Sequence, residues 1–442
     1  MSREMRHSGV QWIGDIPKEW KMPRLKNVAE LHGRIGWNGL RSDEFEEDSY
    51  AYLVTGQDFI SSEISWDKCY QIRRERYDED PFIQLNNGEI LVTKDGTIGK
   101  IAIVSKMDKP GCLNSGIFVL RQKNEAFVPK FLYWQLYSSL LKTYNDYMNL
   151  GGTTIIHLYQ NVFERMPLLT PSLSEQQKIA DYLDKVCSDI DDMITLQEQM
   201  IEELKAYKQS VITEAVTKGI YRNALMRNSD IDWIGEIPKH WDIKRFKYLA
   251  TIVRGGSPRP AGDERYYNGN IPFMKVADIT KDEGVYIHSC EYSIKEAGLS
   301  NTRFIEPNTL LLTNSGATLG VPKINTFPTT FNDGIAAFLN LSSNIDILFA
   351  YYSLKARTKF FLESASLGIG QPNLNTDIIG NTKILLPPIS EQHDICNYLN
   401  EKCSEIDSLI TIKQAKIEAL KEYKKSIIYE YVTGKKEVPY GD

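Results

Sequence analysis

Two long stretches of the chain carry apolar residues that recur alternately every four and every three positions. This spacing predicts helices that pair along a coiled-coil seam. The first helix, Ser174 to Thr217, would be about 65 Å long at 1.5 Å per residue, and a lone helix of that length is unstable. We therefore expect the two helices to pack on each other, antiparallel. The predicted seam residues are Ile179, Leu183, Val186, Ile190, Met193, Gln197, Met200, Leu204, Tyr207 and Val211 in the first helix, and Leu399, Cys403, Ile406, Ile410, Lys413, Ile417, Leu420, Lys424 and Ile427 in the second.

Both helices have sequence signals at their ends. Ser174, followed three residues later by Gln177, fits a capping box at the start of the first helix. Gly219 stands where this helix should stop, and Gly434 stands near the end of the second.

The other parts of the chain consist of short alternating apolar runs separated by turn residues. GEILVTKDGTIGKIAIV, starting at Gly88, and NTLLLTNSGATLGVPKI, starting at Asn308, each predict a strand, a glycine turn and a second strand. Aromatic residues at helical spacing are expected in the core, namely Phe131, Tyr133, Trp134 and Tyr137 in the first part and Phe349, Tyr351 and Tyr352 in the second.

The same sequence features occur twice in the same order. WIGDIPKEW at Trp12 returns as WIGEIPKHW at Trp233, and PSLSEQQKIADYLDKVC at Pro171 returns as PPISEQHDICNYLNEKC at Pro387. A period of roughly 200 residues indicates a domain plus a helix in each copy. We predict an α+β fold with two mixed α/β domains of short strands and loops, separated by two long antiparallel coiled-coil helices with pseudo-two-fold symmetry. The predicted segments are a first domain at 1–170, a first helix at 171–219, a connector and repeat start at 220–240, a second domain at 241–386, a second helix at 387–435 and a tail at 436–442.

Composition narrows the class of protein. The 442 residues are 42% hydrophobic and 25% charged, as in soluble globular proteins. Neither a run of about 20 apolar residues nor a signal peptide is found, so a cytoplasmic location is expected. The six cysteines show no CxxC spacing and are expected to be reduced, mostly buried thiols. The net charge of −6 argues against a generally basic nucleic-acid binder, but the stretch from Lys94 to Arg165 holds nine basic and five acidic residues, which permits a local positive surface.

Several motifs come close to known catalytic sites without completing them. GTIGK at Gly96 would be a phosphate-binding loop only if glycine stood at Lys94. LPPI at Leu386 has leucine where the NPPY-type site of amino-methyltransferases has asparagine, and no glycine-rich cofactor loop follows a strand. The histidines show no metal-binding spacing; they are His7, His32, His157, His240, His288 and His393. We predict that the chain has no catalytic site.

The duplicated motifs, together with GTTIIHL before the first helix, resemble the DNA specificity (S) subunit of type I restriction-modification systems over essentially the whole chain. The resemblance implies two target recognition domains, each reading one half of a split site in double-stranded DNA. It also implies that the helices hold two methyltransferase subunits and that restriction translocase subunits join the complex. The chain itself would bind no cofactor, and S-adenosylmethionine would belong to the methyltransferase. The second copy reads GIGQPNLN from Gly368, where only Leu374 aligns with Leu158, as expected if the domains read different half-sites.

Base recognition needs hydrogen-bonding side chains on positioned loops: Arg or Lys for guanine, Asn or Gln for adenine, and Ser or Thr for either. Glycine-rich turns next to strands provide such loops and let the backbone approach phosphate. The candidate DNA contacts are Arg34, Trp37, Lys94, Thr97, Lys100, Thr153, Thr154 and His157 in the first domain, and Arg254, Ser257, Arg259, Asn314, Ser315, Thr318, Gln371 and Asn373 in the second.

Two other interpretations fit parts of the sequence. The recognition subunit of a type II system, whose nuclease and methyltransferase are fused, would carry the same repeats. A coiled-coil interaction protein without a DNA role would share the helices, and salt-dependent DNA binding would distinguish it. A methyltransferase in its own right is disfavoured by the missing asparagine and cofactor loop.

Overall fold

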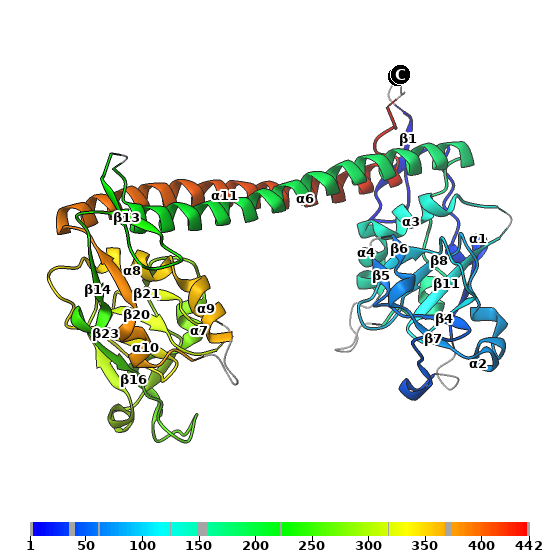
Figure 1. The fold of residues 1–442 in the computed structure, drawn as a ribbon. Helices are drawn as coiled ribbons and strands as arrows, with labels where there is room; N and C mark the ends of the chain where they lie inside the picture. Colours follow the sequence, from blue (N-terminus) through cyan, green and yellow to red (C-terminus); the bar gives the residue numbers. More distant parts are fainter. Residues whose placement is uncertain are drawn as a thin grey trace. The chain divides into compact units, whose positions relative to one another are not determined.

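The computed structural model describes residues 3–34, 40–60, 62–123, 125–148, 157–221, 223–316, 318–366 and 373–439. The chain divides into two compact units (Figure 1). The first unit comprises Met1–Glu198 and Ala415–Asp442, and the second comprises Gln199–Gln414. Each unit therefore contains residues from both copies of the repeat. None of the helices in the described ranges is both long and apolar enough to cross a membrane.

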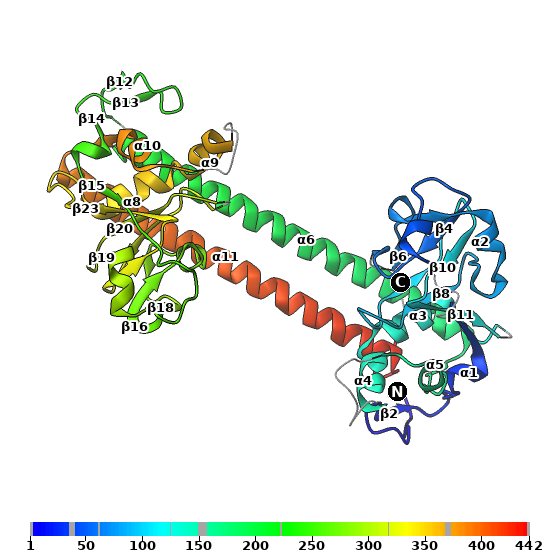
Figure 2. The same ribbon diagram turned by 90° about the horizontal axis from the view of Figure 1, so that it is seen from below.

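The two long helices are α6 (Leu173–Lys218) and α11 (Ile389–Val432), and they lie side by side in Figures 1 and 2. In the first unit the Lys424 Nζ lies 2.7 Å from Asp191 Oδ1, and the rings of Tyr431 and Tyr182 are 4.6 Å apart. Residue numbers rise along α6 while they fall along α11, so the helices run antiparallel there.

The second unit shows the same direction of pairing. The Lys208 Nζ lies 2.7 Å from Asp407 Oδ1, and the Lys413 Nζ lies 3.3 Å from Met200 Sδ. The predicted antiparallel pairing of the two helices is therefore confirmed within each unit.

From Met193 onward, every second residue of the seam predicted for the first helix differs from the structure. Met193, Met200 and Tyr207 are exposed, whereas Ile201 is buried and Ile194 and Lys208 are partly buried. The sequence allowed both choices because apolar residues are adjacent at 193–194 and 200–201. In the second helix the predicted seam is buried or partly buried throughout. Its residues Ile410, Ile417 and Lys424 align with Ile194, Ile201 and Lys208, so the second copy indicates the correct seam positions of the first helix.

The start of α6 is also one residue earlier than predicted. The helix begins at Leu173, and the hydroxyl of Ser172 accepts a hydrogen bond from the Glu175 N–H at 3.3 Å. Ser174 lies inside the helix, so the capping box predicted there is wrong. The other end is as predicted, because Gly219 follows the last helical residue with φ of +77°.

The glutamine of each Ser-Glu-Gln motif joins a helix start to its domain. The buried Gln176 amide accepts from the Val128 N–H at 2.8 Å and donates to the Pro171 carbonyl at 3.0 Å. Gln392 makes the equivalent bonds to Asp346 and Pro387, both at 2.8 Å. A buried amide with both ends bonded fixes the direction in which the helix leaves the domain.

Each WIG motif belongs to a β-hairpin. Gly14 and Gly235 form the turns with φ of +74° and +71°, a backbone conformation that favours glycine. The hairpins pair in the same register, with Met5 opposite Pro17 and Met226 opposite Pro238. Their strands are β1 (Met5–His7) with β2 (Asp15–Pro17), and β12 (Met226–Asn228) with β13 (Glu236–Pro238).

The tryptophan after each hairpin is buried against the end of a long helix. A Cβ added at Gly434 would lie 3.0 Å from the Trp20 ring, and one added at Gly219 would lie 3.2 Å from the Trp241 ring. Thus the first hairpin covers the end of α11, and the second covers the end of α6.

The domain in the first unit contains two sheets. The antiparallel sheet has the order β3 (Ala29–His32), β11 (Ile117–Gln122), β8 (Ile90–Thr93), β9 (Ile101–Ile103). The second sheet has the order β10 (Gly111–Leu113), β4 (Ala51–Val54), β7 (Tyr70–Ile72), in which β10 and β4 are parallel. The other elements are β5 (Phe59–Ile60), β6 (Glu63–Ile64), α1 (Leu25–Val28), α2 (Arg74–Asp78), α3 (Pro129–Tyr137), α4 (Ser139–Met148) and α5 (Gln160–Phe163).

The domain in the second unit repeats this topology with one additional edge strand in each sheet. Its first sheet has the order β15 (Thr251–Arg254), β23 (Ile335–Leu339), β20 (Leu310–Thr313), β21 (Pro322–Asn325), β17 (Tyr286–Ile287). Its second has the order β18 (Tyr292–Ile294), β16 (Tyr267–Met274), β22 (Thr329–Phe331), β19 (Arg303–Ile305). The other elements are β14 (Asp242–Arg245), β24 (Lys383–Leu386), α7 (Val276–Thr280), α8 (Ile347–Lys355), α9 (Thr358–Ser366) and α10 (Thr376–Asn381).

The predicted core residues are largely confirmed. Phe131, Tyr133 and Trp134 are buried, as are the three aromatic residues predicted in the second domain, whereas Tyr137 is exposed at the end of α3. Cys290 is partly exposed and the other five cysteines are buried. Burial raises the pKa of Cys187 to about 12 and that of Cys112 to about 11, so both thiols stay protonated at neutral pH.

Candidate nucleic-acid interface

The predicted glycine turn in the first unit is closed by a buried threonine. Thr93, the last residue of β8, donates through Oγ1 to the Thr97 carbonyl at 2.6 Å and accepts from the Lys100 N–H at 2.9 Å. The Gly99 N–H donates to the Thr93 carbonyl at 3.0 Å, and Gly99 has φ of +79°. These bonds hold residues 94–99 as a defined loop between β8 and β9.

The second unit contains the same hydrogen bonds in a loop that is one residue longer. Thr313, the last residue of β20, donates to the Thr318 carbonyl at 2.6 Å and accepts from the Val321 N–H at 2.9 Å. The Gly320 N–H donates to the Thr313 carbonyl at 2.8 Å. Thr93 and Thr313 were not predicted as site residues, although both copies show the signal, a threonine that ends the strand before each glycine turn.

Two further backbone bonds gather three loops at one place in each domain. The Lys94 N–H donates to Gly116 O at 2.8 Å, and Lys94 O accepts from the Leu158 N–H at 3.1 Å. Asn314 is bonded in the same way to Gly334 at 2.9 Å and to Leu374 at 2.8 Å. The predicted alignment of Leu374 with Leu158 is therefore confirmed, and Asn314 occupies the position of Lys94.

In the first unit the loop carries cations beside an aromatic ring. The Lys94 Nζ lies 4.8 Å from the centre of the Phe118 ring, and the Lys100 Nζ donates to Gly56 O at 3.0 Å. Among the described residues neither lysine has a carboxylate partner. The Asp95 carboxylate of the same loop lies 2.8 Å from His157 Nδ1. The loop therefore presents two lysines whose charges are not neutralised within this part of the protein.

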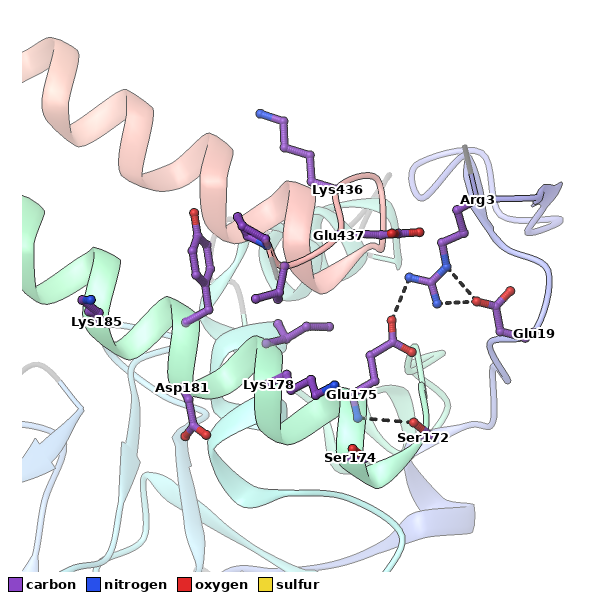
Figure 3. A pocket seen from close by; sticks show the side chains of 14 residues that line it. Arg3, Glu19, Ser172, Ser174, Glu175, Lys178, Asp181, Lys185, Lys436 and Glu437 are labelled. Atoms are coloured by element: carbon purple, nitrogen blue, oxygen red, sulfur yellow. Dashed lines mark hydrogen bonds and ion pairs between the residues drawn. The ribbon is translucent and has the colours of Figure 1, made fainter. Parts of the chain in front are cut away.

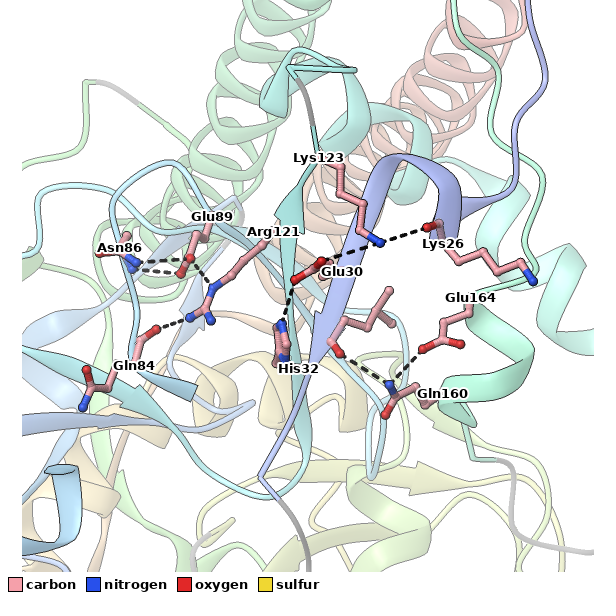
Figure 4. Close-up of polar contacts among 11 residues, drawn as sticks. Lys26, Glu30, His32, Gln84, Asn86, Glu89, Arg121, Lys123, Gln160 and Glu164 are labelled. Carbon is pink, nitrogen blue, oxygen red and sulfur yellow. Dashed lines mark hydrogen bonds and ion pairs between the residues drawn. The ribbon is translucent and has the colours of Figure 1, made fainter. Parts of the chain in front are cut away.

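Most of the other basic residues between Lys94 and Arg165 are neutralised. Figure 4 shows the network on the β3 and β11 strands, in which Arg121 Nε lies 2.7 Å from Glu89 Oε1 and Lys123 Nζ lies 3.6 Å from Glu30 Oε1. The same stretch contains the ion pairs Lys106–Glu63, Lys109–Asp48 and Lys130–Asp184. The basic surplus seen in the sequence thus leaves four basic residues without a carboxylate partner in the described part of the chain, namely Lys94 and Lys100 at the glycine turn, Lys142 and Arg165.

In the second unit three candidates converge on one aspartate. The Ser257 hydroxyl donates to Asp333 Oδ1 at 2.7 Å, the Arg254 Nε donates to Asp333 O at 2.5 Å, and an Arg259 nitrogen lies 3.7 Å from Asp333 Oδ2. Glycine is required at Gly255 and Gly256, because an added Cβ would lie 2.2 Å from a carbonyl oxygen of Asn332 and of Asn301, respectively.

The neighbouring loop in the second unit is neutral and rich in amides. Ser315 and Asn373 pair as an antiparallel bridge, and Thr318 is exposed. The Asn314 side chain is buried, and neither of its amide atoms has a hydrogen-bond partner in the described part of the chain. The two glycine turns therefore share one backbone framework and differ in side-chain chemistry.

The sequence model of the family described as "Type I restriction modification DNA specificity domain" matches residues 17–206 and 238–432, one match in each repeat. The chain belongs to this DNA specificity family. A specificity subunit of a type I restriction enzyme from Methanocaldococcus jannaschii, MjaVIII, is 26% identical over 440 residues, which cover 95% of this chain and 93% of the relative. The EcoBI specificity subunit of Escherichia coli is 25% identical over 430 residues, covering 92% and 84%.

Solved structures show the same fold. A chain from the study "Structural basis underlying complex assembly and conformational transition of the type I R-M system" superposes with a TM-score of 0.71 at 18% identity, over 95% of this chain and 99% of that one. The HsdS subunit from Thermoanaerobacter tengcongensis superposes with a TM-score of 0.54 at 16% identity, over 95% and 98%. The family match identifies the chain as a DNA specificity subunit of a type I system, in preference to the alternatives considered from the sequence.

One candidate contact of this specificity subunit is engaged inside its domain. Arg34 is 2% exposed, and its Nε donates to Leu113 O at 3.0 Å beside the Cys112 thiol. Its guanidinium is therefore held by the β10 strand, whereas the amide of Asn314, which is also buried, has no partner in the described part of the chain. Four other candidates, Trp37, Thr153, Thr154 and Gln371, lie outside the described residues. Within the described ranges no cluster of three or more His, Cys, Asp or Glu side chains could hold a metal ion.

The buried Asn314 side chain offers a test of stability against recognition. An unpartnered buried polar group costs about 1–3 kcal/mol, so Asn314→Leu should raise the free energy of unfolding by about 1 kcal/mol or more. Urea unfolding followed by tryptophan fluorescence measures this change. We expect the same substitution to weaken DNA recognition by the second unit. Asn314→Asp keeps a polar group in this buried position but makes it a carboxylate, so it should lower the free energy of unfolding.

Proposed function

We propose that this specificity subunit reads a two-part DNA site with unlike halves, one half with each unit, and that it carries out no catalysis. The observation that supports the proposal is the shared loop framework with different side chains. At matching positions the first unit has Lys94 and Lys100, and the second has Asn314, which is buried, and Val321. Lysine suits phosphate or guanine, and amides and hydroxyls suit adenine and other base edges. Equal frameworks with unlike side chains are what two different half-sites require.

The candidates that remain for DNA contact in the described residues fall into two groups. In the first unit they are Lys94, Thr97, Lys100 and His157. In the second unit they are Arg254, Ser257, Arg259, Asn314, Ser315, Thr318 and Asn373. Arg254, Ser257 and Arg259 all contact Asp333. We propose that the two arginines contact phosphate and that the amide loop beside them contacts bases.

The specificity subunit needs partner subunits for methylation and restriction. The family connects the chain with DNA and the restriction-modification complex. We propose specifically that it binds two methyltransferase subunits, which carry S-adenosylmethionine, and that restriction translocase subunits join them. The specificity subunit would itself bind no cofactor, in agreement with the missing asparagine at Leu386.

Reconstitution with the methyltransferase encoded beside it tests the proposal. Host DNA lacking the modification should be methylated at a motif with two unlike specified parts separated by unspecified bases, as mapped by single-molecule sequencing. The specificity subunit alone should transfer no methyl group. A contiguous motif, or a palindrome, would contradict reading by two different units.

The two lysines of the first glycine turn should provide salt-dependent affinity. Each phosphate contact contributes about 0.9 to the slope of log K against log salt concentration, so Lys94→Ala with Lys100→Ala should reduce the slope by about 2 in the methyltransferase complex. Fluorescence anisotropy with a duplex containing the mapped site measures the slope. The matched control is Lys106→Ala with Lys130→Ala, which removes two lysines paired with Glu63 and Asp184. An equal decrease of the slope in both double variants would mean that the decrease comes from the loss of positive charge in general and not from phosphate contacts at the glycine turn.

A further inference from the structure

One face of α6 in the first unit combines apolar and charged residues. An ideal helix turns about 100° per residue, which places six residues within about 80° of one another. This α6 face consists of Lys178, Tyr182, Lys185, Asp189, Met193 and Leu196. Met193 is 42% exposed and Leu196 is 50% exposed, far more than an apolar residue in a coiled-coil seam.

The second unit carries the matching face on α11. Its residues stand at the same positions of the repeat, and this α11 face consists of Asp394, Tyr398, Glu401, Glu405, Leu409 and Ile412. Leu409 is 48% exposed and Ile412 is 63% exposed. Two exposed apolar residues and one tyrosine therefore recur at the same spacing in both units, which indicates a repeated binding function and not a chance exposure.

A hollow adjoins each face. In the first unit a hollow of about 840 Å³ is lined by Lys178, Tyr182 and Lys185 of α6 and by residues 436–439 after α11. Figure 3 shows Lys178 and Lys185 on α6, with Lys436 on the other side of this hollow. In the second unit a hollow of about 790 Å³ lies between Tyr398 and the residues around Gly219. Each face thus provides a place into which a partner's side chains can insert.

The charges on the two faces are opposite. Lys178 and Lys185 on the α6 face align with Asp394 and Glu401 on the α11 face. The remaining acidic residues, Asp189 and Glu405, align with each other. The net charges of the two faces therefore differ by four elementary charges, and the whole difference arises at the two aligned positions where lysine is replaced by aspartate or glutamate. The tyrosine hydroxyl of Tyr221 already donates to Asp394 at 2.8 Å, which leaves Glu401 as the acidic residue most open to a partner.

We propose that the two faces bind two copies of one partner, the methyltransferase subunit, with unequal affinity because of this charge reversal. The inference rests on the proposed function, since it takes the partner from there. The matched exposed apolar residues make both faces fit the same partner surface. Whatever charge that surface carries, attraction at one face becomes repulsion at the other. Assembly is then ordered, with one unit occupied before the other.

The expected inequality is large enough to measure. Each exposed charge pair changes an equilibrium constant by a factor of about 1.5 to 5, so the two faces should differ in Kd by roughly tenfold at low salt. Salt screens exposed charges, with a Debye length of about 30 Å at 0.01 M and about 3 Å at 1 M. The two dissociation constants should therefore converge as salt increases.

The full-length chain allows each face to be measured alone. Met193→Glu with Leu196→Arg blocks the α6 face, and Leu409→Glu with Ile412→Arg blocks the α11 face, both without a change in net charge. Titration calorimetry with the methyltransferase, in the absence of DNA, gives the Kd of the open face over a range of salt concentrations. Adding Lys178→Asp and Lys185→Glu to the chain with the blocked α11 face should move the Kd of the α6 face to that of the α11 face.

The matched control is Lys68→Asp with Lys142→Glu, which makes the same charge change at two exposed lysines of the first unit that are not part of the long helices. It should leave the Kd unchanged. Equal dissociation constants for the two faces at low salt, or no effect of the Lys178 and Lys185 substitutions, would overturn the inequality. Unchanged binding to a chain with both faces blocked would contradict the proposal that the methyltransferase binds at these two faces. Failure of the unaltered chain to bind the methyltransferase would instead contradict the proposed function.

Discussion

A fragment of residues 1–219 should form a homodimer and, with the methyltransferase, should redirect methylation from the original site to a palindrome of the first half-site. The fragment contains the first hairpin, the first domain and all of α6. In the full-length chain the core of the first unit is completed by Ile427, Ile428 and Val432 of α11. The matching residues of α6 are Val211, Ile212 and Val216, so a second copy of the fragment can supply an equivalent apolar surface. Identical halves around a two-fold axis must read a symmetric site.

The polar pairs along the seam also permit self-association. Asp191 binds Lys424 in the first unit, and Lys208 binds Asp407 in the second. Because Lys424 matches Lys208 and Asp407 matches Asp191, an α6 homodimer would form the Asp191–Lys208 pair twice. The charges on the seam therefore favour the antiparallel homodimer as they favour the α6–α11 pair.

One position of the homodimer would be underpacked, which provides a control. The buried Tyr431 ring stacks on Tyr182 in the full-length chain, but its match in α6 is Ala215. Filling the resulting cavity by Ala215→Tyr should stabilise the dimer by about 2 kcal/mol or more, which is roughly thirtyfold in Kd. Analytical ultracentrifugation measures the Kd, and methylation mapping reads the motif. A monomeric fragment, or methylation at the original unlike halves, would contradict the two-copy organisation.

Exchange of residues 241–386 for the same segment of a relative should replace one half of the methylated motif and leave the other half unchanged. The two ends of this segment pair directly, with Asp242 opposite Leu386 and Arg245 opposite Lys383. Both junctions of the exchange therefore lie at one end of a two-stranded ribbon, and the long helices remain intact. Base contacts move with the exchanged loops, while the helices of the recipient still hold the partners.

Methylation mapping of the exchange variant reads each half separately. The matched control exchanges residues 21–170, whose ends also pair, through Lys21 with Thr170 and Arg24 with Pro167. This control should change the opposite half. Simultaneous change of both halves in either variant would mean that recognition is shared between the units.

Features that occur in both copies of the repeat were predicted correctly from the sequence. The choice between two adjacent apolar residues in the α6 seam was not. The antiparallel helices, the glycine turns and the helix end at Gly219 follow from patterns present in both copies. The seam of α6 was misplaced because Met193 and Ile194 are both apolar, and only packing decides which one faces the partner helix. The second copy contained the answer, since Ile410 and Ile417 match Ile194 and Ile201, whereas Lys416 matches Met200.

The candidate site shows a similar limit. Sequence placed Lys94, Lys100, Asn314 and Ser315 on loops that the structure indeed gathers around the glycine turns. It could not show that Arg34 donates to the Leu113 carbonyl of β10, because that strand lies 79 residues away in the sequence. Nor did it show that Asp333 joins Arg254 with Ser257, since this contact also depends on distant strands.

The composition of the first unit has a consequence for the newly made protein. Its segment from Ala415 onward is translated after both domains, and Gly434 in that segment packs against Pro17 and Trp20 of the first repeat. The first domain can therefore complete its core only after the second domain has been synthesised. A nonsense mutation between Ala415 and Gly434 would damage the first domain before the second, and a quality-control protease would find its earliest substrate far in sequence from the lesion.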